Sequence, residues 1–354
     1  MNYLWMFVVP CAVSLVLVPI VKRIAWKLEI YAVENARTVH HGKIARVGGI
    51  AVYLAFLVGI TVFAKVDDSI RGMLVGGFIV FIGGLLDDMY NLPAKVKLLF
   101  QGAGAIAVMW IGNVYLSVLH LPFGITINAH IISALLTFVW IIGITNAINL
   151  LDGLDGLSSG FSIIVLLTIC LLCTTNHRYD IMPVSLVLAG ATMGFLRYNF
   201  HPASIFIGDC GAQFLGFMIS SISLLGFKGG TFITLAIPIT LLFVPITDTL
   251  VAIARRKLAG MKFSDPDKNH LHHTLMRTWG LGQRATVLII YLVTLLFGFS
   301  AYLYVVNEKV GLLMLFVLIV CFELFIEITG MVSKTFHPVM NILRKMGLVS
   351  KKEK

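Results

Sequence analysis

Long apolar runs constrain the fold of this chain more than any other feature. A helix needs about 20 apolar residues to cross the hydrocarbon core of a bilayer, and its backbone polar groups must then be satisfied within the helix itself. Eleven runs suit this role, with approximate bounds 3–20, 48–65, 70–87, 98–116, 130–148, 156–175, 181–198, 210–227, 231–253, 286–306 and 309–331. The sequence therefore predicts an all-α polytopic membrane protein with about eleven transmembrane helices.

The composition supports this fold class, because 58% of the residues are hydrophobic and only 12% are charged. A soluble domain carries about twice that charge. The first run is too long for the apolar core of a signal peptide, and no small-residue cleavage site follows it, so we expect it to be the first span. Most of the five cysteines lie inside apolar runs, and we expect no disulfide framework.

Basic residues are distributed unevenly between the two sets of loops. With the N-terminus outside, the inner loops and the C-terminal tail hold 22 of the 27 Lys and Arg residues, and the outer loops hold 5. Because cytoplasmic loops carry the excess of Lys and Arg, we expect the N-terminus outside and the C-terminus in the cytoplasm. We divide the chain into a membrane unit, 1–335, and a basic cytoplasmic tail, 336–354, which we expect along the membrane surface.

Acidic residues gather on the same inner side. Eleven of the 17 acids fall there, and this is separate information because the orientation used Lys and Arg only. The net charge of +10 suits an anionic inner leaflet and anionic substrates, and it requires no nucleic-acid partner. We therefore predict an active site on the cytoplasmic loops.

The stretch NAINLLDGLDGLSSG contains the most specific of these polar patterns. Asp152 and Asp155 are three residues apart, so on a helical turn they share a face. Gly153 and Gly156 free the backbone and admit a ligand closely, and Asn149 adds an amide three residues upstream. A plain turn with one Asp capping a helix accounts for one carboxylate and leaves the rest unexplained. The pattern indicates a ligand-facing turn.

Three further acids end or begin predicted spans. Asp87 and Asp88 end the third span, and adjacent helical residues point about 100° apart, so we expect one to act as a base and the other to orient a metal or a water. Interfacial anchoring is the alternative for this pair. Asp209, in FIGDCG, is either a helix cap or a ligand of Mg²⁺, which prefers carboxylate oxygens.

The late inner loop carries the cluster His270, His272 and His273. Zinc sites usually combine His residues three to five apart with other soft ligands, and no Cys is near this cluster. Contacts to phosphate or to sugar hydroxyls suit the cluster better, with an ordinary exposed basic loop as the alternative. Four more residues are plausible phosphate contacts and read equally well as inner-leaflet anchors: Lys43, Arg46, Lys97 and Gln101.

Four motifs in order, LLDD, NAINLLDGLDG, FIGDCG and NHLHH, each lie on an inner loop. Together they resemble the polyprenyl-phosphate N-acetylhexosamine-1-phosphate transferase family, of the glycosyltransferase 4 type, over almost the whole chain. The HxHH core, followed by an Arg-bearing segment, looks like the WecA/TagO branch, whose donor is UDP-N-acetylglucosamine. The muramoyl-pentapeptide branch, which typically carries HHH, is the alternative.

The resemblance implies a reaction in the cytoplasmic (plasma) membrane. Undecaprenyl phosphate in the inner leaflet attacks the β-phosphorus of UDP-N-acetylglucosamine, and UMP leaves, either in one in-line step or by a two-step route through an aspartyl-phosphate. The product, undecaprenyl-diphospho-N-acetylglucosamine, would begin an envelope glycan such as teichoic acid or the O-antigen of lipopolysaccharide. The family also implies Mg²⁺, with Mn²⁺ as an alternative, and a homodimer.

The resemblance assigns roles to residues at matching motif positions. The catalytic pair is Asp87, the base, with Asp88 close to the metal and phosphates. The metal ligands are Asp209 and Asn149. The substrate-binding residues are Asp152, Asp155, His270, His272, His273, Lys43, Lys97, Gln101 and Asn199.

Two other classes of protein compete with this interpretation. A secondary transporter, proton-coupled through Glu323 and Glu327, should place its polar groups near the membrane midplane, whereas here they gather at one rim. A membrane scaffold explains the basic residues and leaves the Asp set unexplained. The one-rim pattern favours an enzyme that uses a soluble and a lipid substrate together.

Overall fold

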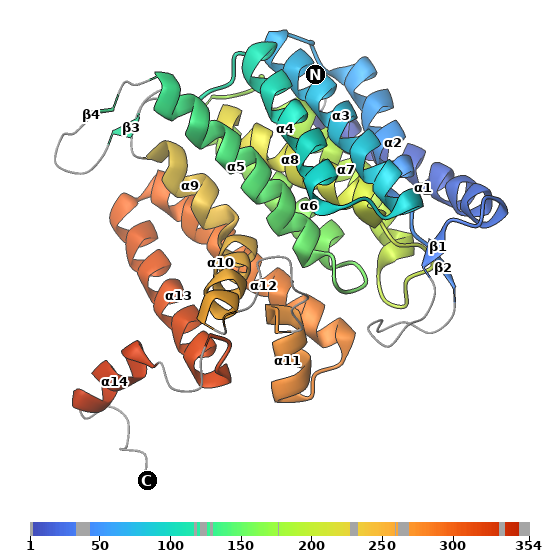
Figure 1. The fold of residues 1–354 in the computed structure, drawn as a ribbon. Helices are drawn as coiled ribbons and strands as arrows, with labels where there is room; N and C mark the ends of the chain where they lie inside the picture. The colour runs from blue at the N-terminus through green and yellow to red at the C-terminus, as the bar shows by residue number, and fades with distance from the viewer. Residues whose placement is uncertain are drawn as a thin grey trace.

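The fold is known from a computed structural model, which describes residues 3–32, 43–116, 119–120, 126–127, 130–175, 177–226, 233–258, 260, 269–332 and 337–346. Most of these residues are helical (Figure 1). The helices are α1 (Tyr3–Lys27), α2 (Gly49–Phe63), α3 (Asp68–Tyr90), α4 (Ala94–Trp110), α5 (His130–Leu151), α6 (Leu157–Thr175), α7 (Met182–Asn199), α8 (Gly208–Gly226), α9 (Ile233–Leu241), α10 (Phe243–Leu258), α11 (Leu271–Trp279), α12 (Gln283–Val306), α13 (Glu308–Thr329) and α14 (Pro338–Lys345).

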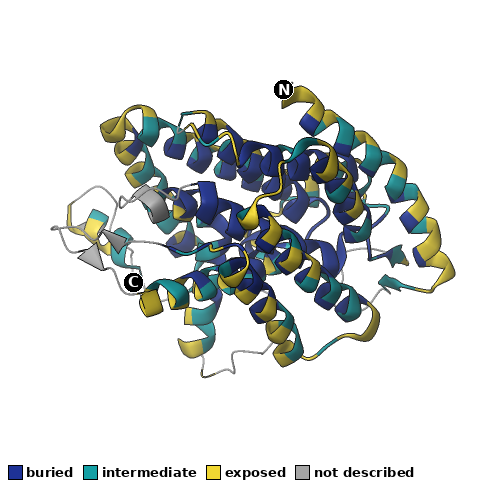
Figure 2. Ribbon diagram, turned by 90° about the horizontal axis from the view of Figure 1, so that it is seen from above, coloured by how far each residue is buried: buried dark blue, intermediate teal, exposed yellow. Residues whose placement is uncertain are grey.

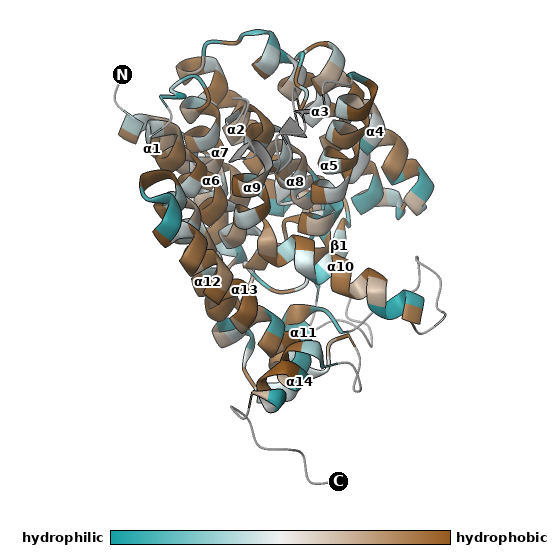
Figure 3. Cartoon of the chain, turned by 90° about the vertical axis from the view of Figure 1, so that its left-hand side faces the viewer, coloured by the Kyte–Doolittle hydropathy of each residue, from teal (hydrophilic) through white to brown (hydrophobic). Residues whose placement is uncertain are grey.

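The prediction of an all-α polytopic membrane protein is confirmed. Among the described residues, seven helices are long and apolar enough to cross a membrane: α1, α3, α5, α6, α8, α12 and α13. The shorter α2 is also apolar. Large apolar side chains face outward along these helices, as Phe316 (66% exposed) and Ile131 (84% exposed) illustrate, and Figure 3 shows apolar residues along most of their length. Such surfaces suit contact with lipid.

The predicted ninth span, 231–253, forms two helices instead of one. The break falls between Leu241, the last residue of α9, and Phe243, the first of α10. Pro245 has no N–H to donate to the carbonyl of Leu241 four residues earlier, which interrupts the helical hydrogen bonds at this point. Residues 231 and 232, where the span was expected to begin, lie outside the described residues.

Helix α8 forms the centre of the bundle, where Figure 2 shows the buried residues concentrated. It packs against α3 and α5. Every residue of α8 is buried except Asp209, in its first turn. The central helix therefore presents one carboxylate to the outside of the core, at its N-terminal end.

Two glycines allow α8 to approach its neighbours closely at that end. A Cβ added to Gly84 of α3 would lie 2.6 Å from Cα of Cys210, and one added to Gly49 of α2 would lie 2.3 Å from the backbone nitrogen of Gly211. Any larger residue would push the backbones apart. The contacts fix the first turn of α8, and thus Asp209, against the C-terminal end of α3 and the N-terminal end of α2.

Two short strand pairs lie at opposite ends of the bundle (Figure 1). At one end β1 (Tyr31–Ala32) pairs antiparallel with β2 (Ile44–Ala45); at the other β3 (Leu119–His120) pairs with β4 (Thr126–Ile127). Beyond β2 the chain hydrogen-bonds to the segment before α8: the N–H of Phe206 donates to the carbonyl of Ala45 (2.8 Å), and the N–H of Gly48 donates to the carbonyl of Phe206 (2.9 Å). Arg46 is thereby held next to α8.

The predicted tail contains one short helix, α14, and its last eight residues, 347–354, lie outside the described residues. The buried carboxylate of Glu327 accepts from the backbone N–H groups of Val339 (2.6 Å) and Met340 (2.8 Å). The first N–H groups of a helix lack partners within the helix. Glu327 therefore caps α14, which gives this membrane acid a structural role.

Candidate functional site

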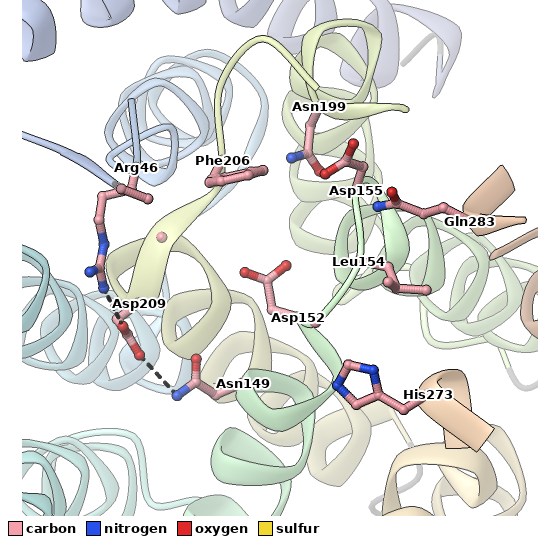
Figure 4. A pocket seen from close by; sticks show the side chains of 13 residues that line it. Arg46, Asn149, Asp152, Leu154, Asp155, Asn199, Phe206, Asp209, His273 and Gln283 are labelled. Atoms are coloured by element: carbon pink, nitrogen blue, oxygen red, sulfur yellow. Dashed lines mark hydrogen bonds and ion pairs between the residues drawn. The ribbon is translucent and has the colours of Figure 1, made fainter. Parts of the chain in front are cut away.

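A polar cavity of about 420 Å³ opens at the end of the bundle where α8 begins. Residues from segments far apart in the sequence surround it (Figure 4). Its lining consists of Ala32, Arg46, Asn149, Asp152, Gly153, Leu154, Asp155, Asn199, Phe206, Gly208, Asp209, His273 and Gln283. Six of the predicted site residues are among them: Asn149, Asp152, Asp155, Asn199, Asp209 and His273.

Asp209 is the meeting point of three elements. Its Oδ2 accepts from a guanidinium nitrogen of Arg46 (3.1 Å), and its Oδ1 accepts from the side-chain amide of Asn149 (3.0 Å), as Figure 4 shows. The ammonium of Lys97 lies 3.7 Å from the same Oδ1. Charge-assisted hydrogen bonds of this kind are roughly twice as strong as neutral ones. The carboxylate is thus held in place while 19% of its side chain stays exposed.

Asp88 organises the beginning of α8 from the neighbouring helix α3. Its two oxygens accept from the backbone N–H groups of Asp209 and Cys210, both at 2.9 Å, and Oδ1 also accepts from Arg46 at 3.2 Å. These N–H groups have no partner within α8, and a carboxylate is favourable at the positive end of a helix dipole. Of the two alternatives for Asp209, the cap is therefore supplied by Asp88, and the Asp209 side chain faces the cavity.

Asp87 lies beside the same cluster and points differently, as expected for adjacent helical residues. It forms an ion pair with Lys97, and its Oδ1 accepts from the backbone N–H of Leu92 (2.7 Å). Lys97 lies close to both Asp87 and Asp209. The predicted catalytic pair, Asp87 and Asp88, therefore lies next to Asp209. Asp87 shares Lys97 with it, Asp88 shares Arg46 with it, and both carboxylates of the pair are buried.

The Asp-Gly turn separates α5 from α6 and gives its two carboxylates different partners. Asp152 accepts from the hydroxyl of Ser158 (2.5 Å), whereas Asp155 accepts from the backbone N–H of Ala203 (3.0 Å) and contacts Nδ1 of His201 (2.7 Å). Burial raises the pKa of Asp152 to about 7, an effect that the Ser158 hydroxyl only partly offsets. Both carboxylates face the cavity, and we infer that they contribute separate contacts to its occupant.

The three histidines divide between the cavity and its support. His273 lines the cavity, whereas His270 and His272 are 6% and 2% exposed. Nδ1 of His270 lies 2.9 Å from a carboxylate oxygen of Asp248. Burial lowers the pKa of His272 to about 3, so this ring stays neutral at physiological pH. The prediction that all three histidines contact substrate thus has geometric support for His273 alone.

Three other predicted substrate contacts have their side chains engaged within the protein. Lys43 donates to the hydroxyl of Tyr31 (2.9 Å). Gln101 is buried and donates to Gln213 (3.0 Å). Asn199 lines the cavity, but its amide donates to the carbonyl of Ile205 (3.1 Å). We infer that Gln101 and Asn199 support the site from behind.

Arg46 lines the cavity, as do Phe206 and Gln283, which no sequence motif indicates. Arg46 was one of several plausible phosphate contacts, yet it bridges Asp88 and Asp209. No local pattern distinguished it from Lys43, three residues earlier. The pairing of Ala45 with Phe206, which aims Arg46 at α8, depends on segments that lie far apart in the sequence.

The donors around Asp209 suit Mg²⁺. This ion commonly takes one or two carboxylates and completes its shell with water and substrate phosphates. Asp209 offers a carboxylate on the cavity wall, and Asn149 brings an amide within hydrogen-bond distance. The described residues contain no group of three or more His, Cys, Asp or Glu side chains arranged to hold a metal. An open site completed by a substrate therefore fits better than a closed one.

Comparisons with known proteins agree with the sequence motifs. A model of glycosyl transferase family 4 matches residues 70–227. A probable undecaprenyl-phosphate N-acetylglucosaminyl 1-phosphate transferase of Bacillus subtilis is 41% identical over 345 residues, which cover 96% of each chain. A decaprenyl-phosphate N-acetylglucosaminephosphotransferase of Mycobacterium leprae is 34% identical over 78% of this chain and 77% of its own. An undecaprenyl-phosphate alpha-N-acetylglucosaminyl 1-phosphate transferase of Escherichia coli O157:H7 is 30% identical, over 76% and 75%.

Proposed function

This chain belongs to glycosyl transferase family 4, and on that basis we propose that it transfers N-acetylglucosamine-1-phosphate from UDP-N-acetylglucosamine to undecaprenyl phosphate. The observation that carries the proposal is the cavity at the end of the membrane bundle. It combines Asp209, Arg46 and Asn149 with the Asp-Gly turn and His273. A polar cavity at the end of an apolar bundle suits an enzyme that joins a soluble nucleotide to a lipid phosphate.

The proposed arrangement in the membrane follows from the charge distribution. We place the N-terminus outside and the C-terminus in the cytoplasm, with about eleven crossings, of which α9 and α10 together form the ninth. The cavity then opens to the cytoplasm, where nucleotide sugars are made. The plasma membrane is the expected location, and a homodimer is an expectation from family analogy.

The proposed reaction is a single phosphoryl transfer. An oxygen of the lipid phosphate forms a bond to the β-phosphorus of the donor, and the bond from that phosphorus to the oxygen bridging it to the α-phosphate breaks. UMP leaves with that oxygen, and undecaprenyl-diphospho-N-acetylglucosamine remains in the membrane. Because little covalent chemistry falls to the protein in such a transfer, positioning and charge stabilisation supply most of the acceleration.

The main obstacle is the repulsion between two anionic substrates. Arg46 and Lys97 provide two fixed cations next to Asp209, and the guanidinium can bind phosphate oxygens through two parallel hydrogen bonds. Mg²⁺, held by Asp209 and Asn149, would neutralise further charge on the phosphates when bound. Mn²⁺ offers similar oxygen coordination.

Asp87 is the proposed base for the acceptor phosphate. Its ion pair with Lys97 places it at the edge of the charged cluster. The second pKa of a phosphate monoester is about 6, so much of the acceptor is already a dianion at neutral pH. Asp87 then acts mainly on the protonated fraction and orients Lys97, while Asp152, Asp155 and His273 hold the nucleotide and sugar.

The proposal is tested with purified protein, UDP-N-acetylglucosamine, undecaprenyl phosphate and Mg²⁺. We expect release of UMP that requires both substrates and falls by at least 100-fold in Asp209→Asn, since removing an electrostatic contact at a reacting phosphate costs about that much. Asp180→Asn is the matched control, because Asp180 pairs with Arg178 on a surface loop away from the cavity. UMP release with UDP-N-acetylmuramoyl-pentapeptide but not with UDP-N-acetylglucosamine would contradict the proposed donor.

A further inference from the structure

A buried Asp–His pair links the membrane bundle to helix α11, which carries His273. Asp248 belongs to α10 and is 4% exposed, and His270 precedes α11 and is 6% exposed. One carboxylate oxygen lies 2.9 Å from Nδ1 of His270, and the other accepts from the backbone N–H of Leu271 at 2.8 Å. This geometry allows Nδ1–H of His270 to donate to the carboxylate, which offers only acceptors when ionised.

These two contacts fix both the position and the rotation of α11. The N–H of Leu271 is one of the first in the helix, which have no partner within it, and the His270 ring supplies a second point of attachment. A helix held at two points on one carboxylate cannot turn about its axis without losing one of them. The next residues in the motif, His272 and His273, are therefore presented in a set direction.

A third contact closes α11 against the Asp-Gly turn. A Cβ added to Gly153 would lie 2.3 Å from Nε2 of His272, so the ring rests directly on the turn backbone. The rings of His272 and His273 are 4.3 Å apart. Gly153 and His273 both line the cavity, whereas Asp248 and His270 are absent from its lining. The anchor thus lies behind the wall that the substrate would meet.

We propose that Asp248 is a positioning residue of the transferase, which acts through His270 to fix α11 so that His273 faces the cavity. The inference rests on the proposed function. It assigns the three histidines separate tasks: His270 anchors the helix, His272 packs on the Asp-Gly turn, and His273 contacts the substrate.

The test is a double-mutant cycle on kcat/KM with Asp248→Asn, His273→Ala and the combined variant. A misplacement of about 1 Å can cost on the order of 100-fold, so we expect each single change to lower kcat/KM by about 10–100-fold. If Asp248 acts through His273, the combined variant should lose little more than the poorer single variant. If the fold-losses in kcat/KM of the two single variants multiply in the combined variant, the inference is overturned, because a merely structural effect of Asp248→Asn would be independent of the loss at His273.

The matched control is Glu327→Gln. Glu327 is also a buried acid that holds the first N–H groups of a short helix, and that helix, α14, does not contribute to the cavity. We expect Glu327→Gln and Asp248→Asn to lower the thermal midpoint in detergent to a similar extent, while only Asp248→Asn lowers kcat/KM. Equal losses of activity would show that tethering a helix affects turnover only through stability, and would sink the assignment.

A second pair of variants covers the case in which Asp248→Asn does not fold. His270→Asn keeps an N–H donor near the position of Nδ1, and His270→Ala removes it. We expect the Asn variant to retain most of the activity and the Ala variant to resemble His273→Ala; equal impairment of both would count against the anchor. Absence of UMP release from the unmodified protein would instead refute the proposed function, so the two failures are distinguishable.

Discussion

A methyl group added at Gly84 tests whether the close crossing of α3 and α8 sets the geometry of the cavity. The Cβ of an alanine at this position would lie 2.6 Å from Cα of Cys210 and 2.7 Å from the carbonyl oxygen of Asp209. Non-bonded carbon atoms settle at about 3.5–4.0 Å, so the helices must separate by about 1 Å. Both obstructing atoms belong to the backbone, and no change of rotamer relieves the contact.

The separation acts directly on the cap that Asp88 gives α8. Its bonds to the N–H groups of Asp209 and Cys210 are 2.9 Å long, and a shift of that size takes them beyond the range of a normal hydrogen bond, about 3.2 Å. Overpacking of this kind costs about 1–3 kcal/mol of stability. Because Asp209 moves with α8, we expect kcat/KM for UMP release to fall on the order of 100-fold.

Gly143→Ala provides the control for the Gly84→Ala variant. Gly143 lies in α5, and an added Cβ there would meet no atom within 4 Å. Alanine favours a helix over glycine by about 0.5–1 kcal/mol, so this variant should keep its activity and its thermal midpoint or raise the latter slightly. UMP release by Gly84→Ala is measured with both substrates at saturating and at limiting concentrations. Rates equal to those of the unmodified protein would refute the idea that this crossing positions Asp209.

Three further predictions concern the charges of the site. Arg46→Lys keeps the charge but loses the fork that bridges Asp88 and Asp209; we expect kcat/KM to fall by about 10–100-fold, since two charge-assisted bonds at about 1.5–3 kcal/mol each cannot both be kept. Burial raises the pKa of Asp152 to about 7, so the folded state holds this proton more tightly than the unfolded state. Asp152 should therefore contribute a loss of stability as pH rises from about 4 to about 7, by up to ~1.4 kcal/mol per pH unit, and the thermal midpoint of Asp152→Asn should fall less over this range than that of the unmodified protein. Chelation with EDTA should abolish UMP release, and added Mg²⁺ should restore it; full turnover after chelation would contradict the proposed metal.

The helices were largely predictable because lipid leaves the backbone few choices. Ten of the predicted spans each overlap a single helix. The remaining predicted span, 231–253, is divided into α9 and α10 just before Pro245, whose missing N–H interrupts the helical hydrogen bonds. Pro238 and Pro245 both lie in this run, and apolar content alone cannot show at which of them the helix divides.

The site was predictable as a set of residues and much less so as a geometry. Asn149, Asp152, Asp155 and Asp209 line the cavity as expected. Lys43 does not line the cavity, because its side chain donates to the hydroxyl of Tyr31 in β1. Whether a polar side chain lines a cavity or supports it from behind depends on how each helix is rotated, and that rotation is set by contacts between distant segments.

The roles of the buried acids follow from the same principle. Asp88, Asp248 and Glu327 each lie on one helix and accept from the first N–H groups of another, α8, α11 and α14 respectively. A helix that begins at the membrane rim has unpaired N–H groups there, and a carboxylate from a neighbour satisfies them while fixing the contact between the two helices. Two of these acids hold elements of the cavity, and the third holds a helix outside it. In these three cases the acid fixes a junction between two helices, and the position of that junction relative to the cavity decides whether it also serves the chemistry.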